Sequence, residues 1–103
     1  MIRTSADKVE KIQFAAEVLK TIGHPSRLQI IELLMHEEEC SVAQIQENLG
    51  LEQSLLSHHL NRMKLRGILS SHKIGKQVFY AVKLQQVKKI LECMDNCDFQ
   101  LKQ

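Results

Sequence analysis

The sequence is poor in features on which several large classes of protein depend. Its 103 residues include no tryptophan, one proline, four glycines and three cysteines. They contain no glycine-rich loop that would cradle a phosphate and no nucleophile at a recognisable spacing from a base, so we expect the protein not to be an enzyme. No apolar run approaches the ~20 residues that a membrane-spanning helix needs, so we expect no membrane partner.

The length and the first residues limit the number of domains and the expected compartment. At 103 residues the chain has the size of one ordinary domain, well below the roughly 200 residues of an α/β barrel. The opening stretch MIRTSADKVEKIQ has no apolar core of a secretory signal. With an odd number of cysteines and no such signal, we expect a cytoplasmic protein without a disulfide framework. We therefore expect one domain over residues 1–103.

Acidic residues are absent from one long stretch. Residues 1–52 carry five bases and nine acids, a net charge of −4, and residues 84–103 carry three of each. Residues 53–83 carry six bases and no acid. Such a stretch is typical of a surface that contacts phosphates. Charge alone leaves open a basic face that is merely solvated, so the local structure must decide.

Apolar spacing and helix-stopping residues predict the elements. The predicted helices cover residues 5–22, 26–35, 42–49, 54–66 and about 84–101. Ser5, Ser41 and Ser54 are the expected N-caps, and Gly50 and Gly67 end the third and fourth helices. A β-hairpin is expected within residues 70–82, with Lys73-Ile74-Gly75-Lys76 between its strands. The inward face of the fourth helix is expected to consist of Leu55, Leu56, His59, Leu60 and Met63.

The third and fourth helices have the size and the turn of a helix-turn-helix, and the hairpin after them is basic. The outward positions of the fourth helix hold polar or forked side chains that can reach base edges and phosphates. Its N-terminus offers free N–H groups to a phosphate. We predict DNA contacts from Gln53, Ser54, Ser57, His58, Asn61, Arg62, Lys64, Lys73, Lys76 and Gln77. The predicted fold is mainly α with one β-hairpin, a winged helix-turn-helix of order α-α-α-α-β-β-α.

The segments that match a known family are LKTIGHPSRLQIIELL (19–34), SVAQIQENLGLEQSLLSHHLNRMKLRGIL (41–69) and GKQVFYAV (75–82). Together they resemble the ArsR/SmtB family of bacterial repressors over nearly the whole chain. The resemblance implies a dimeric winged helix that binds an imperfect palindrome in a promoter and dissociates when a metal ion or an oxidant is sensed. It also implies that His59 and Leu60 face the core, that Lys73 and Lys76 contact the DNA backbone, and that the major groove receives Gln53, Ser54, Ser57 and His58.

The first and last predicted helices carry apolar stripes, which are Val9/Ile12/Ala16/Leu19 and Val87/Ile90/Met94/Leu101. A domain this small does not easily bury both stripes. A two-fold symmetric dimer through these helices would cover them and would match a palindrome with half-sites ~34 Å, or a multiple of that, apart. The alternative is that both stripes pack within one subunit.

The metal ligands common in the family are mostly missing at the matching positions. Its third-helix cysteine pattern corresponds here to Ser41-Val42-Ala43-Gln44-Ile45, with Cys40 one residue earlier. Its last-helix ligand positions correspond to Leu84, Gln86, Cys97 and Gln100, of which only Cys97 is a good ligand.

The cysteines remain as candidate sensors: Cys93 and Cys97, with Cys40 as a further candidate. Cys93 and Cys97 are four residues apart and are expected to share a helix face, which suits a soft ion such as As(III), Cu(I), Cd(II) or Zn(II). A disulfide between them would need local unwinding, because Cβ atoms so spaced lie ~5–6 Å apart against ~3.8 Å in a bridge. Otherwise the partner would be Cys40 or a cysteine of a second subunit. Inert packing of these thiols is the alternative.

The sequence thus predicts a DNA-binding repressor, dimeric on double-stranded promoter DNA and released at its cysteines by a soft metal, a metalloid or a thiol oxidant. A repressor of the same family without an inducer is one alternative. A winged-helix adaptor that binds proteins is another, although it would not need an acid-free basic stretch.

Overall fold

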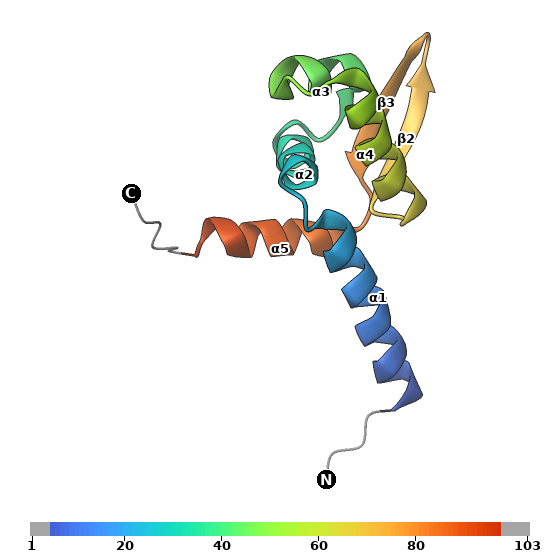
Figure 1. Cartoon of the computed structure of the whole chain (residues 1–103), viewed down its shortest axis with the longest axis vertical. Coiled ribbons are helices and arrows are strands. Elements are labelled where there is room, and N and C mark those ends of the chain that lie inside the picture. The colour runs from blue at the N-terminus through green and yellow to red at the C-terminus, as the bar shows by residue number, and fades with distance from the viewer. Residues whose placement is uncertain (1–4, 98–103) are drawn as a thin grey trace.

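A computed structural model of the chain describes residues 5–97 (Figure 1). Its elements are α1 (Ala6–Ile22), α2 (Pro25–Glu37), β1 (Cys40–Ser41), α3 (Val42–Leu49), α4 (Gln53–Leu65), β2 (Leu69–Ile74), β3 (Gln77–Val82) and α5 (Gln85–Asp95). The order of helices and hairpin is the one expected for a winged helix-turn-helix. Among residues 5–97 there is no helix that combines the length and the apolarity needed to cross a membrane.

Side-chain caps fix where the first and third helices begin. The Ser5 hydroxyl accepts a hydrogen bond from the Lys8 N–H at 3.2 Å. Ser41 forms a capping box with Gln44, in which each side chain accepts from the other residue's backbone N–H. Gly50 ends α3 with φ +65°, a left-handed conformation that glycine adopts without strain. These predicted boundaries are confirmed.

The predicted cap of α4 is wrong. The carboxylate of Glu52, not Ser54, caps this helix, accepting from the Ser54 and Leu55 N–H groups at 3.0 Å each. The Ser54 hydroxyl donates to both oxygens of the same carboxylate at 2.7 Å. A charged oxygen pair satisfies two free N–H groups at once, so the cap of the helix lies two residues earlier than predicted.

The sheet has three antiparallel strands in the order β1-β3-β2. In the hairpin Ile74 pairs with Gln77, so the turn is only Gly75-Lys76 and is tighter than expected. Gly75 has φ +62°, whereas the φ of Lys76 is not positive. A positive φ at only the first of the two turn residues indicates a type II′ turn. The sequence did not predict β1, a strand of two residues in which Cys40 pairs with Tyr80.

The core lies around α2 and the inner face of α4. Ile30, Ile31 and Leu34 of α2 are buried. The buried residues of α4 are Leu56, His59, Leu60 and Met63, and Val87 and Leu91 supply the contribution of α5. Leu55 was expected on the inward face, but it is 43% exposed, because it lies one residue outside the buried row.

Helices α1 and α5 extend away from this core (Figure 1). In α1 only Val18, Thr21 and Ile22, near its C-terminal end, are buried. Val9, Ile12 and Leu19 are exposed, so the first apolar stripe is not packed within the chain. The second stripe is only partly buried. Val87 is buried, Ile90 and Met94 are exposed, and Leu101 lies outside the described residues.

Candidate nucleic-acid interface

The α3–α4 unit presents one face of α4 to solvent. Gly50 turns the chain sharply after α3, and the Gln46 side-chain amide donates to the Leu51 carbonyl at 3.3 Å across the turn. Leu56, Leu60 and Met63 then fix α4 against the core at helical spacing. The opposite side of α4 therefore faces outward.

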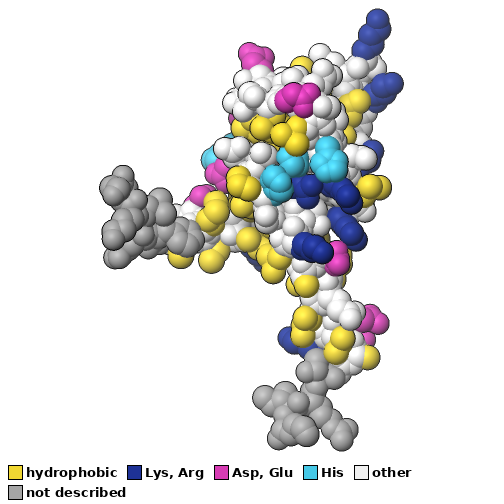
Figure 2. Space-filling model, in the orientation of Figure 1, with side chains coloured by type: hydrophobic (Ala, Val, Ile, Leu, Met, Phe, Trp, Pro, Cys, Tyr) yellow, Lys and Arg dark blue, Asp and Glu magenta, His cyan; other side chains and the backbone are white. Residues whose placement is uncertain are grey.

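All seven residues predicted on this outward side are exposed, namely Gln53, Ser54, Ser57, His58, Asn61, Arg62 and Lys64. The three predicted on the hairpin, Lys73, Lys76 and Gln77, are exposed at and beside its turn. In Figure 2 Lys and Arg side chains extend from the tip of the hairpin to the lower part of α4, while acidic side chains lie mainly over α3 and α1. The structure thus gathers the predicted residues on one polar and basic surface.

The N-terminus of α4 differs from expectation. Its first free N–H groups were predicted to be available to a phosphate, but Glu52 already accepts from two of them. The pKa of the Glu52 carboxyl lies below its ordinary value. The main cause is the hydrogen bond from the Ser54 hydroxyl, followed by the bonds from these N–H groups. A negative charge therefore stands at this helix end, and the Ser54 hydroxyl must leave Glu52 before it can donate a hydrogen bond to a base or a phosphate.

The hairpin is tied to the segment after α2. The His72 ring stacks on Phe79 with ring centres 5.8 Å apart. Its Nε2 lies 3.3 Å from a carboxylate oxygen of Glu39. The Glu39 contact links β2 to the segment after α2, and the stacked rings join β2 to β3, while the tip of the wing remains exposed.

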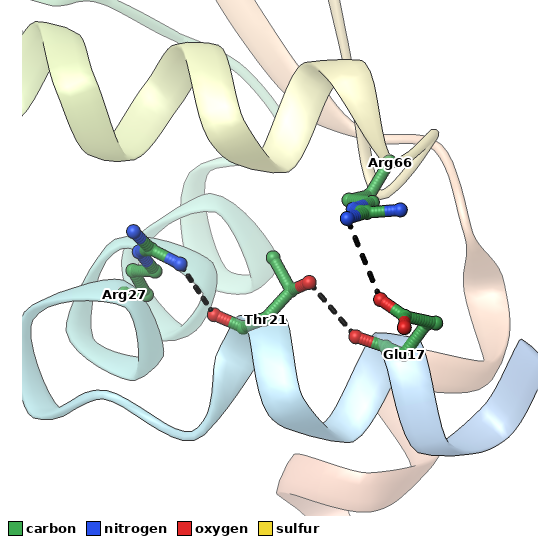
Figure 3. A network of polar contacts seen from close by, with 4 residues as sticks. All are labelled: Glu17, Thr21, Arg27 and Arg66. Atoms are coloured by element: carbon green, nitrogen blue, oxygen red, sulfur yellow. Dashed lines mark hydrogen bonds and ion pairs between the residues drawn. The ribbon is translucent and has the colours of Figure 1, made fainter.

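A buried polar contact joins α4 to the first half of the chain. His59 is almost fully buried, and its Nδ1 accepts from the Arg27 Nε at 2.9 Å. Arg27 also donates through Nη1 to the Thr21 carbonyl at 2.9 Å, as Figure 3 shows. Burial, and then the cations and histidines around it, lower the pKa of His59. The sequence placed His59 in the core as observed, but Arg27 was missed, because nothing in its local pattern indicates a partner 32 residues away.

The cysteines lie in different environments. Cys40 is buried in β1, and burial, followed by Glu37 and Glu39, raises the pKa of its thiol. Cys93 and Cys97 are both exposed. Cys93 lies in the last turn of α5, which ends at Asp95, and the Cys97 N–H donates to the Met94 carbonyl at 3.2 Å just beyond it, so the shared helix face stays a prediction. Within residues 5–97 no cluster of three or more His, Cys, Asp or Glu residues is arranged to hold a metal ion.

Comparisons with known proteins agree with this architecture. The family model described as "Bacterial regulatory protein, arsR family" matches residues 24–71. An uncharacterized HTH-type transcriptional regulator, MJ1325 of Methanocaldococcus jannaschii, is 38% identical over 87 residues, which cover 84% of this chain and 98% of that protein. The transcriptional repressor PagR of Bacillus anthracis is 34% identical over 78% of this chain and 80% of its own length.

Solved structures give the same result. The crystal structure of PagR superposes with a TM-score of 0.77 and 31% identity, covering 84% of this chain and 98% of that one. Reduced HlyU from Vibrio cholerae superposes with a TM-score of 0.80 and 29% identity, covering 91% of this chain and all of that one. The winged helix-turn-helix is therefore the fold of this chain.

Proposed function

This chain belongs to the ArsR family of bacterial regulatory proteins, and from that premise we propose that it is a homodimeric repressor of a palindromic operator in promoter DNA. Proteins of this family are transcriptional regulators, not enzymes. The observation that carries the proposal is the single exposed surface formed by α4 and the hairpin tip, on which no acid occurs between residues 53 and 83. In this proposal residues 1–103 form one cytoplasmic unit for DNA binding and dimerisation.

We assign different roles to the two parts of the surface. The side chains of Gln53, Ser57, His58 and Asn61 lie along the exposed side of α4, where they can read base edges in the major groove. Arg62, Lys64, Lys73 and Lys76, with Gln77, contact the phosphate backbone. Ser54 joins the base readers only after Glu52 releases it.

A mobility-shift titration with the DNA upstream of the protein's own gene tests the proposal. We expect a complex that survives an excess of random competitor DNA at physiological salt. The double variant Ser57→Ala/His58→Ala serves as the matched control, and we expect it to keep non-specific binding but lose the preference. Equal binding of promoter and competitor DNA by the wild-type protein would remove the proposed function.

An adaptor that binds proteins is the second candidate function. Such an adaptor would need exposed apolar residues on α4. Leu55 and Leu65 are exposed there, at 43% and 73%. They are separated by about 15 Å along the helix and point in different directions around it, at 3.6 residues per turn. They therefore form no common apolar patch, and the polar surface supports DNA better.

The dimer is proposed to form over the groove between α1 and α5. This groove has a volume of about 840 Å³, and its apolar lining comes from Phe14, Ala15, Val18, Leu19, Leu84, Val87 and Ile90. Of the stripe expected on α1 only Leu19 lines it, whereas the exposed Phe14, which the stripe did not include, lines it as well. A second copy related by two-fold symmetry would bury both helices against their equivalents.

Release is proposed to begin at Cys93 and Cys97, by a soft metal, a metalloid or a thiol oxidant. Both thiols are exposed, whereas the buried Cys40 with its raised thiol pKa is a poor nucleophile. Cys97 lies just beyond the end of α5, where its N–H donates to the Met94 carbonyl at 3.2 Å. A disulfide or a bound ion at this pair would act on a helix of the proposed dimer groove.

A further inference from the structure

A hollow of about 360 Å³ lies between the C-terminal part of α1, the start of α2 and α4. We call it the basic hollow, after the charged and titratable side chains that line it: Glu17, Lys20, Arg27, His58, Arg62 and Arg66. One carboxylate faces four permanent cations there, which leaves a net charge of +3 when His58 is neutral. In Figure 2 Lys, Arg and His side chains gather over the junction of α1 and α4.

The two cations from the first half of the chain are the unexpected ones. Lys20 and Arg27 belong to residues 1–52, where acids outnumber bases nine to five. The fold nevertheless directs both toward the one helix whose exposed side carries no acid. Among the acids of that half only Glu17 lines the hollow, and the others lie nearer the start of α1, on α2 and the segment after it, on α3 and just before α4.

Arg27 is held in place with one end free. Its Nε and Nη1 donate to His59 and to the Thr21 carbonyl, both at 2.9 Å. No hydrogen bond from its Nη2 occurs within residues 5–97. Burial and then Arg62 lower the pKa of the Arg27 guanidinium, so its charge is not balanced by a nearby acid. A fixed guanidinium with free N–H groups in a positive field is well suited to receive an anion.

The single acid of the hollow does not neutralise it. Glu17 Oε2 lies 3.5 Å from a guanidinium nitrogen of Arg66, with both side chains about half exposed (Figure 3). Ion pairs this exposed contribute little stability, so Arg66 can exchange Glu17 for a stronger partner. The Glu17 carbonyl is meanwhile occupied by the Thr21 hydroxyl at 2.8 Å.

We infer that the basic hollow binds a phosphate group, with Arg27, Arg62 and Lys20 as its principal ligands. Guanidinium groups bind phosphate through paired N–H donors, and a lysine adds a point charge. Because His58 and Arg62 belong also to the DNA-binding surface proposed above, we assign the phosphate to the backbone of bound DNA, beside the groove that α4 enters. The assignment of this phosphate to DNA rests on the proposed function, whereas the inference that the hollow binds a phosphate group does not.

Salt dependence of DNA binding tests the source. Lys20→Gln removes one charge from the hollow, and Lys8→Gln is its matched control on the same helix, about 18 Å away. We expect Lys20→Gln to weaken binding to promoter DNA and to random-sequence duplex alike, and to lower the slope of log K against log salt by about one. The control is expected to bind as wild type.

Titration with inorganic phosphate and pyrophosphate, without DNA, tests the site. We expect saturable NMR shifts of the Arg27 Nε–H signal, lost in Lys20→Gln/Arg62→Gln and kept in Lys8→Gln. Saturable shifts with an unchanged DNA slope would support the site and replace its source by a free phosphate compound. Absence of both effects would overturn the inference even if promoter binding stands. If the wild-type protein binds no DNA, the proposed function fails and this titration alone decides the site.

Discussion

The contact between Arg27 and His59 determines the charge of the buried His59 ring. His59 Nδ1 accepts a hydrogen bond from the Arg27 Nε–H, so the proton of the neutral His59 ring is on Nε2, which is buried without a partner among the described residues. Protonation of Nδ1 would break the bond and place a second positive charge against Arg27, with His24 and His58 close by. The neutral ring is therefore the form compatible with the packed core.

The depressed pKa of His59 predicts the pH dependence of stability. The unfolded chain binds this proton near its ordinary pKa of 6.5, whereas the folded protein resists it. The contribution of neutral His59 to the free energy of unfolding is therefore fully present above about pH 6.5. This contribution is lost as the pH is lowered toward the folded pKa, at a rate of at most about 1.4 kcal/mol per pH unit. Urea unfolding between about pH 5 and 7.5 measures this slope. We expect His59→Gln to flatten it and the exposed control His36→Gln to leave it intact; equal slopes in wild type and His59→Gln would contradict the assignment.

Residues of the DNA-binding surface are expected to separate into two kinds. Arg62→Ala and Lys76→Ala should each weaken binding to all sequences and reduce the salt slope by about one, because each removes a phosphate contact. Ser57→Ala and His58→Ala should instead change which base pairs are preferred, with little effect on the salt slope. Selection from a random DNA pool, followed by titration in several salt concentrations, measures both properties. An unchanged preference in the double variant would exclude Ser57 and His58 as base readers.

At the scale of the element, the helix ends decide what each helix offers. The α3 helix begins in a reciprocal capping box, while α4 begins under a carboxylate that already satisfies its first N–H groups. The end of α5 leaves Cys97 outside the helix. These ends determine which polar groups are free to meet a ligand.

The caps lead to opposite expectations for two serines. Ser41→Ala removes the acceptor for the Gln44 N–H from a buried position, and we expect a loss of about 1 kcal/mol in the free energy of unfolding. Ser54→Ala leaves the Glu52 cap on the backbone in place, so its effect should be clearly smaller. Urea denaturation at neutral pH compares the two variants. Equal losses would show that Ser54, as the sequence suggested, is the cap of α4.

The exposed end of α5 makes the sensor proposal testable. We expect the wild-type complex with promoter DNA to dissociate on titration with at least one of arsenite, Cd(II), Cu(I), Zn(II) or a thiol oxidant. Cys93→Ser/Cys97→Ser should bind DNA equally well and resist that agent, while Cys40→Ser should still respond. Release of the double variant by the same agent would exclude this pair, and a wild-type complex indifferent to the whole panel would favour a repressor without an inducer.

At the scale of the whole molecule, α1 and α5 leave their apolar groove open to solvent. We expect a dimer at micromolar concentration by sedimentation, and we expect Phe14→Glu to convert it to a monomer because the new carboxylate would be buried without a partner. Ile74→Glu on the hairpin is the control, since Phe14 and Ile74 are similarly exposed, at 54% and 56%. A wild-type monomer, or a dimer that tolerates Phe14→Glu, would remove this interface.

The sequence by itself determined the five helices, the hairpin and their order. Helical spacing, Ser5, Ser41 and Gly50 set the first and third helices, because caps and periodicity act over a few residues. The outward residues of α4 follow from the same periodicity, so the residues of the proposed DNA-binding surface could be named in advance.

Only the tertiary structure decided how distant residues meet. Arg27 reaches His59, and Lys20 joins Arg62 in the basic hollow, because α1 and α2 fold back onto α4. The two-residue strand β1 exists only through its pairing with β3. Such contacts depend on the relative placement of elements, which no local pattern encodes, and for that reason the net charge of −4 over residues 1–52 concealed part of a basic site.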